Sequence, residues 1–367
     1  MTHLTYLEAA VVGLIQGVSE LFPVSSLGHN VLLPALIGGS WETDLDVAKP
    51  ESPYLAFIVG LHVATAIALL VYFRRDWVRI VGGFVSSVRE HRVETADQRL
   101  AWMIVLATVP VGVVGLVAEH PFRVIFGKPI VAGVFLAVNG VILIAGERFR
   151  RRSSLDADAR IAGARRPEAV GVGGRAAPGA VGPGLAAYAP AVAEPGASGA
   201  SGASGASGAS GASGASGALG ASGAGDPAAP EAEVMADRRL STMGYGRAIV
   251  IGSAQILALL AGISRDGVTM VAGMRRGLAR EDAARFAFLL STPVILAAGM
   301  LKIPDLFGPL GHGIRGQILL GSVLSGLGAY AAIRFLVRYL RTRSLVPFGL
   351  YCLAAGLASV VYLGLVK

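Results

Sequence analysis

Polar side chains that can do chemistry are concentrated in one stretch of an apolar N-terminal region, Gln16–His29, which reads Q-G-V-S-E-L-F-P-V-S-S-L-G-H. Gln16 and Glu20 lie four residues apart and share one face of a helix, where the carboxylate can bind a divalent cation or position water. Ser26 and His29 lie one helical turn apart and can act as a nucleophile and its base. Burying a neutral polar group without a partner costs roughly 2–7 kcal/mol, so this stretch predicts a functional site.

A second polar stretch, Ala261–Thr269, interrupts an apolar segment late in the chain and reads A-G-I-S-R-D-G-V-T. Arg265 is a fixed cation whose forked donors suit phosphate oxygens. Ser264, Thr269 and the backbone N–H groups beside Gly267 can complete an anion cradle at the start of a half-helix. Together the two stretches favour phosphoryl transfer, which depends on positioning and charge neutralisation.

Structural explanations compete with this functional one. Ser25 and Ser26 follow a proline and can simply cap the helix that begins there. His62, in a later apolar segment, can hydrogen-bond a neighbouring helix. Asp266 can form a structural ion pair with Arg265. Residue spacing alone therefore does not separate a phosphatase from an anion transporter.

The composition places the chain among integral membrane proteins. Of its 367 residues, 53% are hydrophobic and only 15% are charged, well below the roughly 25% of soluble domains. The net charge is +8, but the arginines cluster beside apolar runs, as the positive-inside rule predicts, and show no basic–aromatic pattern of a nucleic-acid binder. Cys352 is the single cysteine, which excludes a disulfide framework within the chain.

Six apolar segments are predicted as membrane spans, for which a helix needs about 20 residues. The arginine-rich residues 74–99 and 338–343 then lie on the cytoplasmic side. The predicted spans are Tyr54–Phe73, Leu100–Val117, Pro129–Ala145, Phe286–Met300, Gln317–Val337 and Val346–Leu365.

Two further apolar regions are too short to span the membrane, and each is interrupted by one of the polar stretches. Residues 4–15 and Val31–Ile37 flank the first stretch, and Ala248–Leu260 precedes the second. Half-length segments around a polar break indicate re-entrant hairpins, because broken backbone at membrane depth is tolerated only inside protein or beside a water-filled cavity.

The two halves of the chain therefore match, with one broken hairpin followed by three spans. Because three is odd, the second half is inverted relative to the first. Inverted repeats with broken helices place their sites near the midplane, between the repeats. The sequence thus predicts an all-α polytopic membrane protein of two inverted repeats, in which the two polar stretches face each other. One register sets Pro23 over Gly262, Gln16 over Gln255, Val24 over Ile263, Ser25 over Ser264 and Gly28 over Gly267.

Three regions follow from this pattern: a first membrane repeat in residues 1–152, a cytoplasmic linker in 153–240 and a second membrane repeat in 241–367. Gly-Ala-Ser repeats fill Gly196–Ala218, and this composition cannot bury a core, so the linker is predicted to be disordered.

The motifs resemble those of a known family. The first stretch resembles the first signature of the bacterial undecaprenyl-diphosphate phosphatase family, known also for bacitracin resistance, in which a Glu-or-Gln-x-x-x-Glu pair leads into F-P-V-S-S-x-G-H. G-I-S-R-D-G-V-T resembles its second signature, P-G-x-S-R-S-G-x-T. The segments around His62 and Thr65 and the run F-A-F-L-L-S-T-P at Phe286–Pro293 are also similar. The resemblance covers nearly the whole chain except residues 153–240.

The resemblance implies hydrolysis of undecaprenyl diphosphate to the monophosphate, which recycles the carrier lipid for peptidoglycan synthesis. It implies a multi-pass protein of the cell membrane whose site opens to the outer face, with a divalent cation, Mg²⁺ or Ca²⁺, and it leaves a homodimer open. The catalytic residues it implies are Glu20, Ser26, His29 and Arg265. The substrate-binding residues are Gln16, Ser25, Ser264, Thr269 and Gly267.

Three residues depart from the family pattern. Gln16 is the neutral option at its position, which weakens any mechanism that needs two carboxylates there. Ala261 replaces a proline, which loosens the break. Asp266 replaces a serine, and it either joins Glu20 as a metal ligand or partly neutralises Arg265.

Two mechanisms and two functions stay open at this point. Ser26 can attack the terminal phosphorus while His29 takes its proton. Alternatively, water activated by Glu20 or His29 attacks directly, and Ser26 only donates a hydrogen bond to the phosphate. The alternative function is a lipid-diphosphate or anion transporter built on the same inverted repeats.

Overall fold

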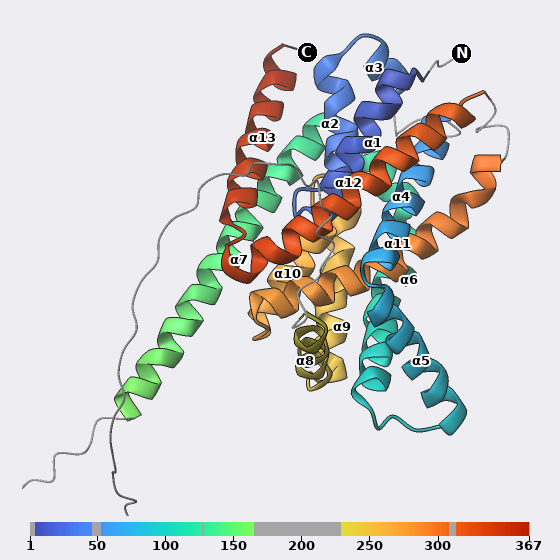
Figure 1. The fold of residues 1–367 in the computed structure, drawn as a ribbon. Coiled ribbons are helices and arrows are strands. Elements are labelled where there is room, and N and C mark those ends of the chain that lie inside the picture. The colour runs from blue at the N-terminus through green and yellow to red at the C-terminus, as the bar shows by residue number, and fades with distance from the viewer. Residues whose placement is uncertain (1–3, 46–52, 127, 165–228, 308–312, 367) are drawn as a thin grey trace, which may run out of the picture. The chain divides into compact units, whose positions relative to one another are not determined.

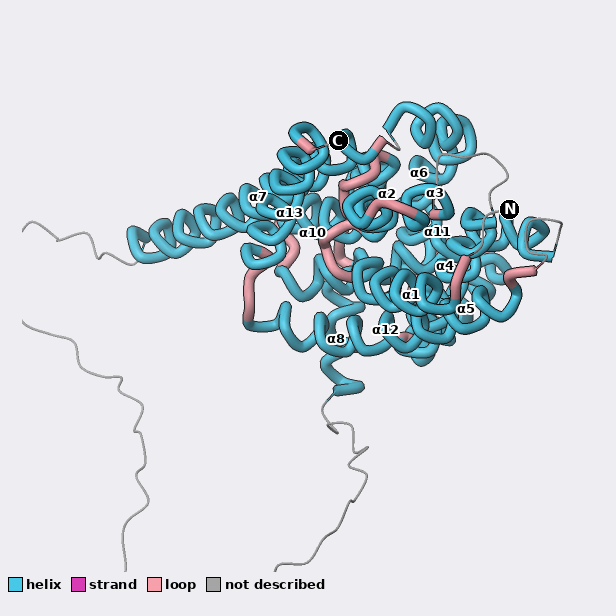
Figure 2. The backbone as a smooth tube through the Cα atoms, turned by 90° about the horizontal axis from the view of Figure 1, so that it is seen from above, coloured by secondary structure: helices cyan, strands magenta, loops and turns pink. Residues whose placement is uncertain are grey.

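The computed structural model describes residues 4–45, 53–126, 128–164, 229–307 and 313–366, and every regular element in those residues is a helix (Figures 1 and 2). The first half contains α1 (Tyr6–Leu21), α2 (Ser26–Ile37), α3 (Ser40–Asp44), α4 (Pro53–Tyr72), α5 (Arg74–Glu90), α6 (Ala96–Phe126) and α7 (Pro129–Ala164). The second half contains α8 (Ala229–Ser241), α9 (Tyr245–Ser253), the 3-10 helix η1 (Ala254–Leu259), α10 (Arg265–Arg275), α11 (Arg280–Phe307), α12 (Arg315–Thr342) and α13 (Val346–Leu365). The all-α prediction is confirmed.

Five segments of the described helices are long and apolar enough to cross a membrane, in α6, α7, α11, α12 and α13. α4 and α5 together provide a sixth if they form one broken span, bent by 87°. Five of the six predicted spans fall within helices, and Tyr54–Phe73 extends one residue beyond the end of α4. The arginine-rich stretch after α4 was predicted only as a cytoplasmic segment, yet α5 fills most of it. The short helix α3 follows α2 directly, before the described residues resume at Pro53.

The linker boundaries drawn from composition are too wide. α7 continues past residue 152 to Ala164, and α8 occupies Ala229–Ser241. α8 is held in place by ion pairs, because Arg239 Nη2 lies 2.7 Å from Asp282 Oδ1 of α11. The Gly-Ala-Ser repeats themselves lie outside the described residues, and their disorder stays a prediction.

α1 opens with a capping box, in which Thr5 Oγ1 accepts from the Glu8 N–H at 3.2 Å and the Glu8 carboxylate accepts from the Thr5 N–H at 2.8 Å.

The first break combines a proline with a strained serine. The chain leaves α1 just before Pro23, which cannot supply an N–H to continue the helix. Ser25 then adopts φ 68°, a left-handed value that few residues other than glycine take. Its Oγ accepts from the Gly28 N–H at 3.2 Å and caps α2.

The second break ends in the same way as the first. α9 continues into the tighter helix η1, and the chain then turns at Gly262. Gly262 has φ 109°, a backbone conformation that would be strained in a residue with a side chain. Ser264 Oγ accepts from the Gly267 N–H at 3.1 Å and caps α10. Both breaks therefore finish on a serine N-cap bonded to a glycine N–H three residues later.

The two breaks lie against each other although they come from opposite halves of the chain. A Cβ added to Gly28 would lie 2.9 Å from the Cα of Gly262. Asn139 of α7 is fully buried and joins them. Its Nδ2 donates to the Pro23 carbonyl at 2.9 Å, and its Oδ1 accepts from the Ser264 N–H at 3.1 Å.

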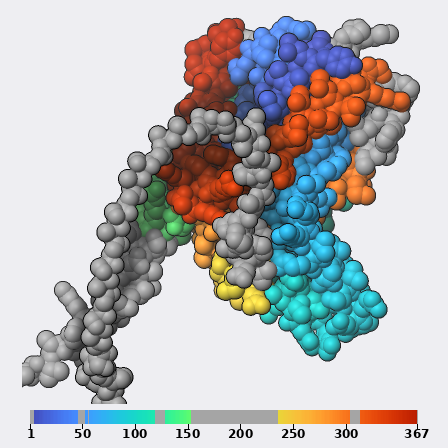
Figure 3. All heavy atoms as spheres, in the orientation of Figure 1, coloured from blue at the N-terminus to red at the C-terminus, as the bar shows by residue number. Residues whose placement is uncertain are grey.

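Small residues let α1 approach α12 closely enough to fix this arrangement. A Cβ added to Gly13 would lie 2.5 Å from the Gly321 carbonyl oxygen, and one on Gly17 would overlap the backbone of Ser325. Such contacts are typical of helix pairs in membranes. On the face drawn in Figure 3, the orange and red atoms of the C-terminal helices lie directly beside the blue atoms of the N-terminal ones.

We predict that Gly262→Ala destabilises the protein strongly. The new Cβ would lie 2.6 Å from the Leu136 nitrogen of α7, on a backbone with φ 109°. The left-handed backbone costs roughly 1–2 kcal/mol and overpacking costs about 1–3 kcal/mol more. Gly112→Ala in α6 is the matched control, because no atom of the described part of the chain lies within 4 Å of its added Cβ. This change should be neutral or slightly stabilising. Thermal unfolding of both variants in one detergent checks this, and equal midpoints would contradict it.

Candidate active site

The centre of the site is an ion pair between the two breaks. Glu20 in the last turn of α1 and Arg265 at the start of α10 meet with Arg265 Nη2 2.5 Å from Glu20 Oε1. The Glu20 side chain is 4% exposed and that of Arg265 17%. Because a buried charge without a partner is strongly destabilising, each of these residues requires the other. The prediction that the two polar stretches face each other is confirmed.

Gln16 and His62 approach the second oxygen of Glu20, and Asn30 holds Gln16. Gln16 Nε2 donates to Glu20 Oε2 at 2.8 Å, and Asn30 Nδ2 of α2 donates to Gln16 Oε1 at 2.6 Å. His62 Nε2 of α4 lies 3.5 Å from Glu20 Oε2 and 3.3 Å from Gln16 Nε2. His62 thus belongs to the site itself, beyond the helix contact considered from the sequence. Gln16 serves Glu20 as a donor, which a second carboxylate could not do.

Ser26 is directed to Glu20. Its Oγ donates a short hydrogen bond to Glu20 Oε2, and the residue is buried. The predicted partner, His29, lies elsewhere: its Nδ1 is 2.7 Å from the Ser25 carbonyl oxygen and its Nε2 is 2.8 Å from the Tyr351 hydroxyl of α13. The structure therefore does not bring the Ser26 hydroxyl and the His29 ring together, because the first turn of α2 directs one toward α1 and the other toward α13.

The predicted substrate-binding residues line the starts of the two half-helices. Ser25 and Ser264 are buried N-caps, and Gly267 supplies the N–H that binds Ser264. Thr269 Oγ1 donates to the Arg265 carbonyl at 2.7 Å, so its hydroxyl is engaged with its own helix. Both α2 and α10 begin beside Glu20, and helix N-termini attract anions.

Asp266 points away from the ion pair, toward α11. Ser291 Oγ donates a short hydrogen bond to Asp266 Oδ1, while Arg265 pairs with Glu20. The structural ion pair between Asp266 and Arg265 that the sequence allowed is thus not the arrangement adopted. Asp266 Oδ2 and Arg265 Nε are buried without a hydrogen-bond partner in the part of the chain that the structure describes.

The residues near Glu20 do not form a metal cage by themselves. Among the described residues there is no group of three or more His, Cys, Asp or Glu side chains that could hold a metal ion. Arg265 beside Glu20 opposes a second positive charge there. Mg²⁺ commonly takes one or two carboxylates and completes its shell with water and substrate phosphates. Any cation here would need the substrate for most of its ligands.

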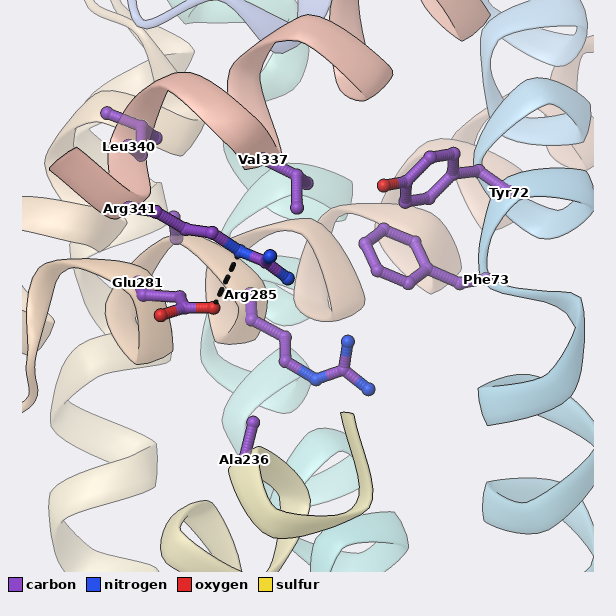
Figure 4. Close-up of a pocket in the computed structure, with 9 residues that line it drawn as sticks. Tyr72, Phe73, Ala236, Glu281, Arg285, Val337, Leu340 and Arg341 are labelled. Carbon is purple, nitrogen blue, oxygen red and sulfur yellow. Dashed lines mark ion pairs between the residues drawn. The ribbon is translucent and has the colours of Figure 1, made fainter. Parts of the chain in front are cut away.

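A cavity drawn in Figure 4 lies apart from these residues and includes none of them. Its charged groups are paired: Arg341 Nε lies 3.1 Å from Glu281 Oε1, and Arg285 binds Asp76 and Asp237 at 3.0 and 2.8 Å. The ion pair between Arg285 and Asp237 joins α11 to α8 at this cavity. The lining residues are Tyr72, Phe73, Ala236, Glu281, Ala284, Arg285, Val337, Leu340 and Arg341.

Comparison with known proteins gives the family. The family described as bacitracin resistance protein BacA matches residues 9–183 and 225–358. The chain belongs to the BacA family. A protein of this kind from Frankia casuarinae, named undecaprenyl-diphosphatase 1, is 53% identical over the full length of both chains. One from Mycolicibacterium paratuberculosis, named undecaprenyl-diphosphatase, is 50% identical over 99% of each chain.

Sequence reasoning did not find several polar residues of this BacA-family site. Asn30, Asn139, Ser291 and Tyr351 all make side-chain hydrogen bonds to the two breaks or to residues of the site. The role of Asn139 could have been inferred most readily from the sequence, because an asparagine inside an apolar span needs a hydrogen-bond partner. Tyr351 carried no such signal, since tyrosines are common at membrane interfaces.

We predict that Arg265→Lys lowers turnover by about 10²–10³-fold, the usual cost of losing one donor to a transition-state anion. Lysine keeps the charge opposite Glu20 but loses the planar fork that binds phosphate oxygens. The control is Arg341→Lys, which alters an exposed pair with Glu281. Activity and thermal unfolding of both purified variants are compared with wild type. Near-wild-type turnover in Arg265→Lys would remove this arginine from the site.

Proposed function

We propose that this protein hydrolyses undecaprenyl diphosphate to undecaprenyl phosphate and inorganic phosphate. This reaction recycles the carrier lipid for peptidoglycan synthesis and gives resistance to bacitracin. The observation that carries the proposal is the Glu20–Arg265 pair, 2.5 Å apart between two helix starts, with Ser26 bonded to the same carboxylate. Full-length relatives named undecaprenyl-diphosphatase support the choice of substrate.

A transporter of lipid diphosphates or anions is the alternative. A transporter would need a positively charged side chain and helix N-termini to hold the anion. Arg265 and the N-termini of α2 and α10 provide both. It would not need a serine hydroxyl bonded to a carboxylate at the same place. The relatives are named for a phosphatase, so the hydrolase is favoured.

Arg265 has a donor to spare for a phosphate. Its Nε is buried without a partner in the described part of the chain, and buried donors in native proteins are nearly always satisfied. A diphosphate that enters beside α2 and α10 competes with Glu20 for the guanidinium. Once Arg265 binds phosphate oxygens, the Glu20 carboxylate loses its ion-pair partner and is free to accept a proton.

In the serine route, Ser26 Oγ attacks the terminal phosphorus and passes its proton to Glu20. The bond between that phosphorus and the bridging oxygen breaks, and undecaprenyl phosphate leaves. Water then hydrolyses the phosphoserine and releases inorganic phosphate. The hydrogen bond from Ser26 to Glu20 favours Glu20 as the base in place of His29. In the water route, Glu20 or His29 activates water, and Ser26 only donates a hydrogen bond to the phosphate.

The inverted-repeat architecture remains part of the proposal, and the packing supports it. Gly13 of α1 meets α12 at Gly321, and its counterpart in the predicted register, Gly252 of α9, meets α6 at Ala107. In each half, a glycine of the broken hairpin therefore packs against the second predicted span of the other half. The matching caps on Ser25 and Ser264 add to this.

Three further features stay proposals that rest on the family resemblance. The site opens to the outer face of the cell membrane, opposite the arginine-rich ends of the spans. A divalent cation, Mg²⁺ or Ca²⁺, accompanies the diphosphate with Glu20 as its nearest protein ligand, whereas Asp266 is occupied by Ser291. The protein is a monomer or a homodimer.

We predict that purified protein in detergent releases inorganic phosphate from undecaprenyl diphosphate. The assay is run with Mg²⁺, with Ca²⁺ and with a chelator. Glu20→Gln keeps the shape of the site but removes the base and the counter-charge of Arg265, so it should be nearly inactive. A transporter would release no phosphate, and equal release by wild type and Glu20→Gln would contradict the role of Glu20 in the reaction.

We predict that Ser26→Ala removes nearly all turnover. Loss of a nucleophile abolishes the serine route, whereas loss of one positioning donor costs about 10²–10³-fold. Ser253→Ala is the matched control, because among the described residues that hydroxyl bonds only the Ile249 carbonyl of its own helix. Retention of more than about one hundredth of the wild-type rate would favour the water route. A phosphorylated Ser26 in acid-quenched protein would establish the serine route.

A further inference from the structure

The ring of His29 is held by two partners that come from opposite ends of the chain. Its Nδ1 is 2.7 Å from the carbonyl oxygen of Ser25, within the first break. Its Nε2 is 2.8 Å from the hydroxyl of Tyr351 in α13, the last helix. The two rings also stack, with centroids 5.8 Å apart and planes inclined by 5°. We propose that Tyr351 is a positioning residue that fixes the orientation of the His29 ring, which rests on the proposed function and on His29 acting in it as a base for water.

The partners decide which ring nitrogen carries hydrogen. A carbonyl oxygen can only accept, so Nδ1 of His29 must be the donor to Ser25. In the neutral ring Nε2 is then the acceptor, and the Tyr351 hydroxyl is the donor that satisfies it. Nε2 is thus the one ring atom that can take up or release a proton, and Tyr351 sets where it points.

The backbone around Ser25 makes this orientation specific. Ser25 is held at φ 68°, a value that strains a residue other than glycine. That conformation directs its carbonyl oxygen at the His29 ring while its Oγ caps α2 through the Gly28 N–H. Ser26, the next residue, points to Glu20. One turn of helix thereby presents a hydroxyl to the carboxylate on one side and an imidazole to α13 on the other.

Tyr351 contributes little to the packing of α13, so we attribute its role to the hydrogen bond that its hydroxyl makes. The residue is 48% exposed, and α13 is fixed to α7 at other positions, through Gly349 against Gly140 and Gly356 against Gly133. Replacing Tyr351 with phenylalanine keeps the stacked ring and removes only the hydrogen bond to Nε2. The variant therefore separates positioning of His29 from the stability of the helix contact.

The test is a double-mutant cycle on purified protein in detergent, read as phosphate release. Tyr351→Phe should lower kcat about tenfold, a part of the roughly 10²–10⁴-fold that a positioned acid–base group contributes, with KM and the unfolding midpoint unchanged. In a His29→Gln background the same change should have no further effect, because Tyr351 acts through His29. Tyr362→Phe, in the same helix and 42% exposed, is the matched control and should leave kcat unchanged.

Several outcomes would overturn the proposal: wild-type kcat in Tyr351→Phe, an equal loss in Tyr362→Phe, or a full tenfold loss added to His29→Gln. Nitrogen NMR of protein with labelled histidine rings provides a reading that does not depend on activity. The His29→Gln spectrum assigns His29 among the six histidines. Wild type should show hydrogen on Nδ1 and a hydrogen-bonded, unprotonated Nε2 that shifts in Tyr351→Phe. An Nε2 signal that is unchanged in Tyr351→Phe rejects the role of Tyr351, whereas absence of phosphate release from wild type rejects the proposed function alone.

Discussion

The ion pair between Glu20 and Arg265 is the interaction on which the rest of the site depends. Both side chains lie in an apolar interior, where either one alone would be a large electrostatic penalty. Pairing them requires the two broken segments to meet, and nothing in the local sequence of either segment provides that. The contact is created by the fold, through Asn139 joining the two breaks and through Gly28 meeting Gly262. The charge balance of the centre is thus tied to the packing of backbone against backbone.

Glycine and serine residues allow the helix backbones to pack this closely. At Gly13 and Gly17 the surface of α12 reaches the backbone of α1, so any larger residue would push the last turn of α1, and Glu20 with it, away from Arg265. In a membrane, helices gain no hydrophobic stabilisation by associating, and close contact of small residues takes its place. The positions that align the site are therefore residues without functional groups, some of them far from it in sequence.

Much of this could be predicted from the sequence, and the reasons for the rest are specific. The helices, the two breaks and the meeting of Glu20 with Arg265 follow from apolar run lengths and from polar groups that require partners. The direction of each side chain does not, because it depends on which helix lies opposite. Ser26 and His29 are one turn apart, which suggested a pair, but α1 lies on one side of that turn and α13 on the other. The wide linker boundaries have a similar origin: α8 is polar in composition and is ordered by ion pairs such as Arg239 with Asp282, which composition does not reveal.

Gln16 shows how one neutral residue can serve a site built around a single carboxylate. Its Nε2 donates to Glu20 while its Oε1 accepts from Asn30, so the amide uses both of its ends. A carboxylate at the same position could not donate to Glu20, and two negative charges would face one arginine. The second acid, Asp266, does not restore that charge, since it turns to Ser291 on α11. One negative and one positive charge therefore balance at the centre of the site. In the mechanism we propose, the arriving diphosphate draws Arg265 toward itself and leaves Glu20 free to accept a proton.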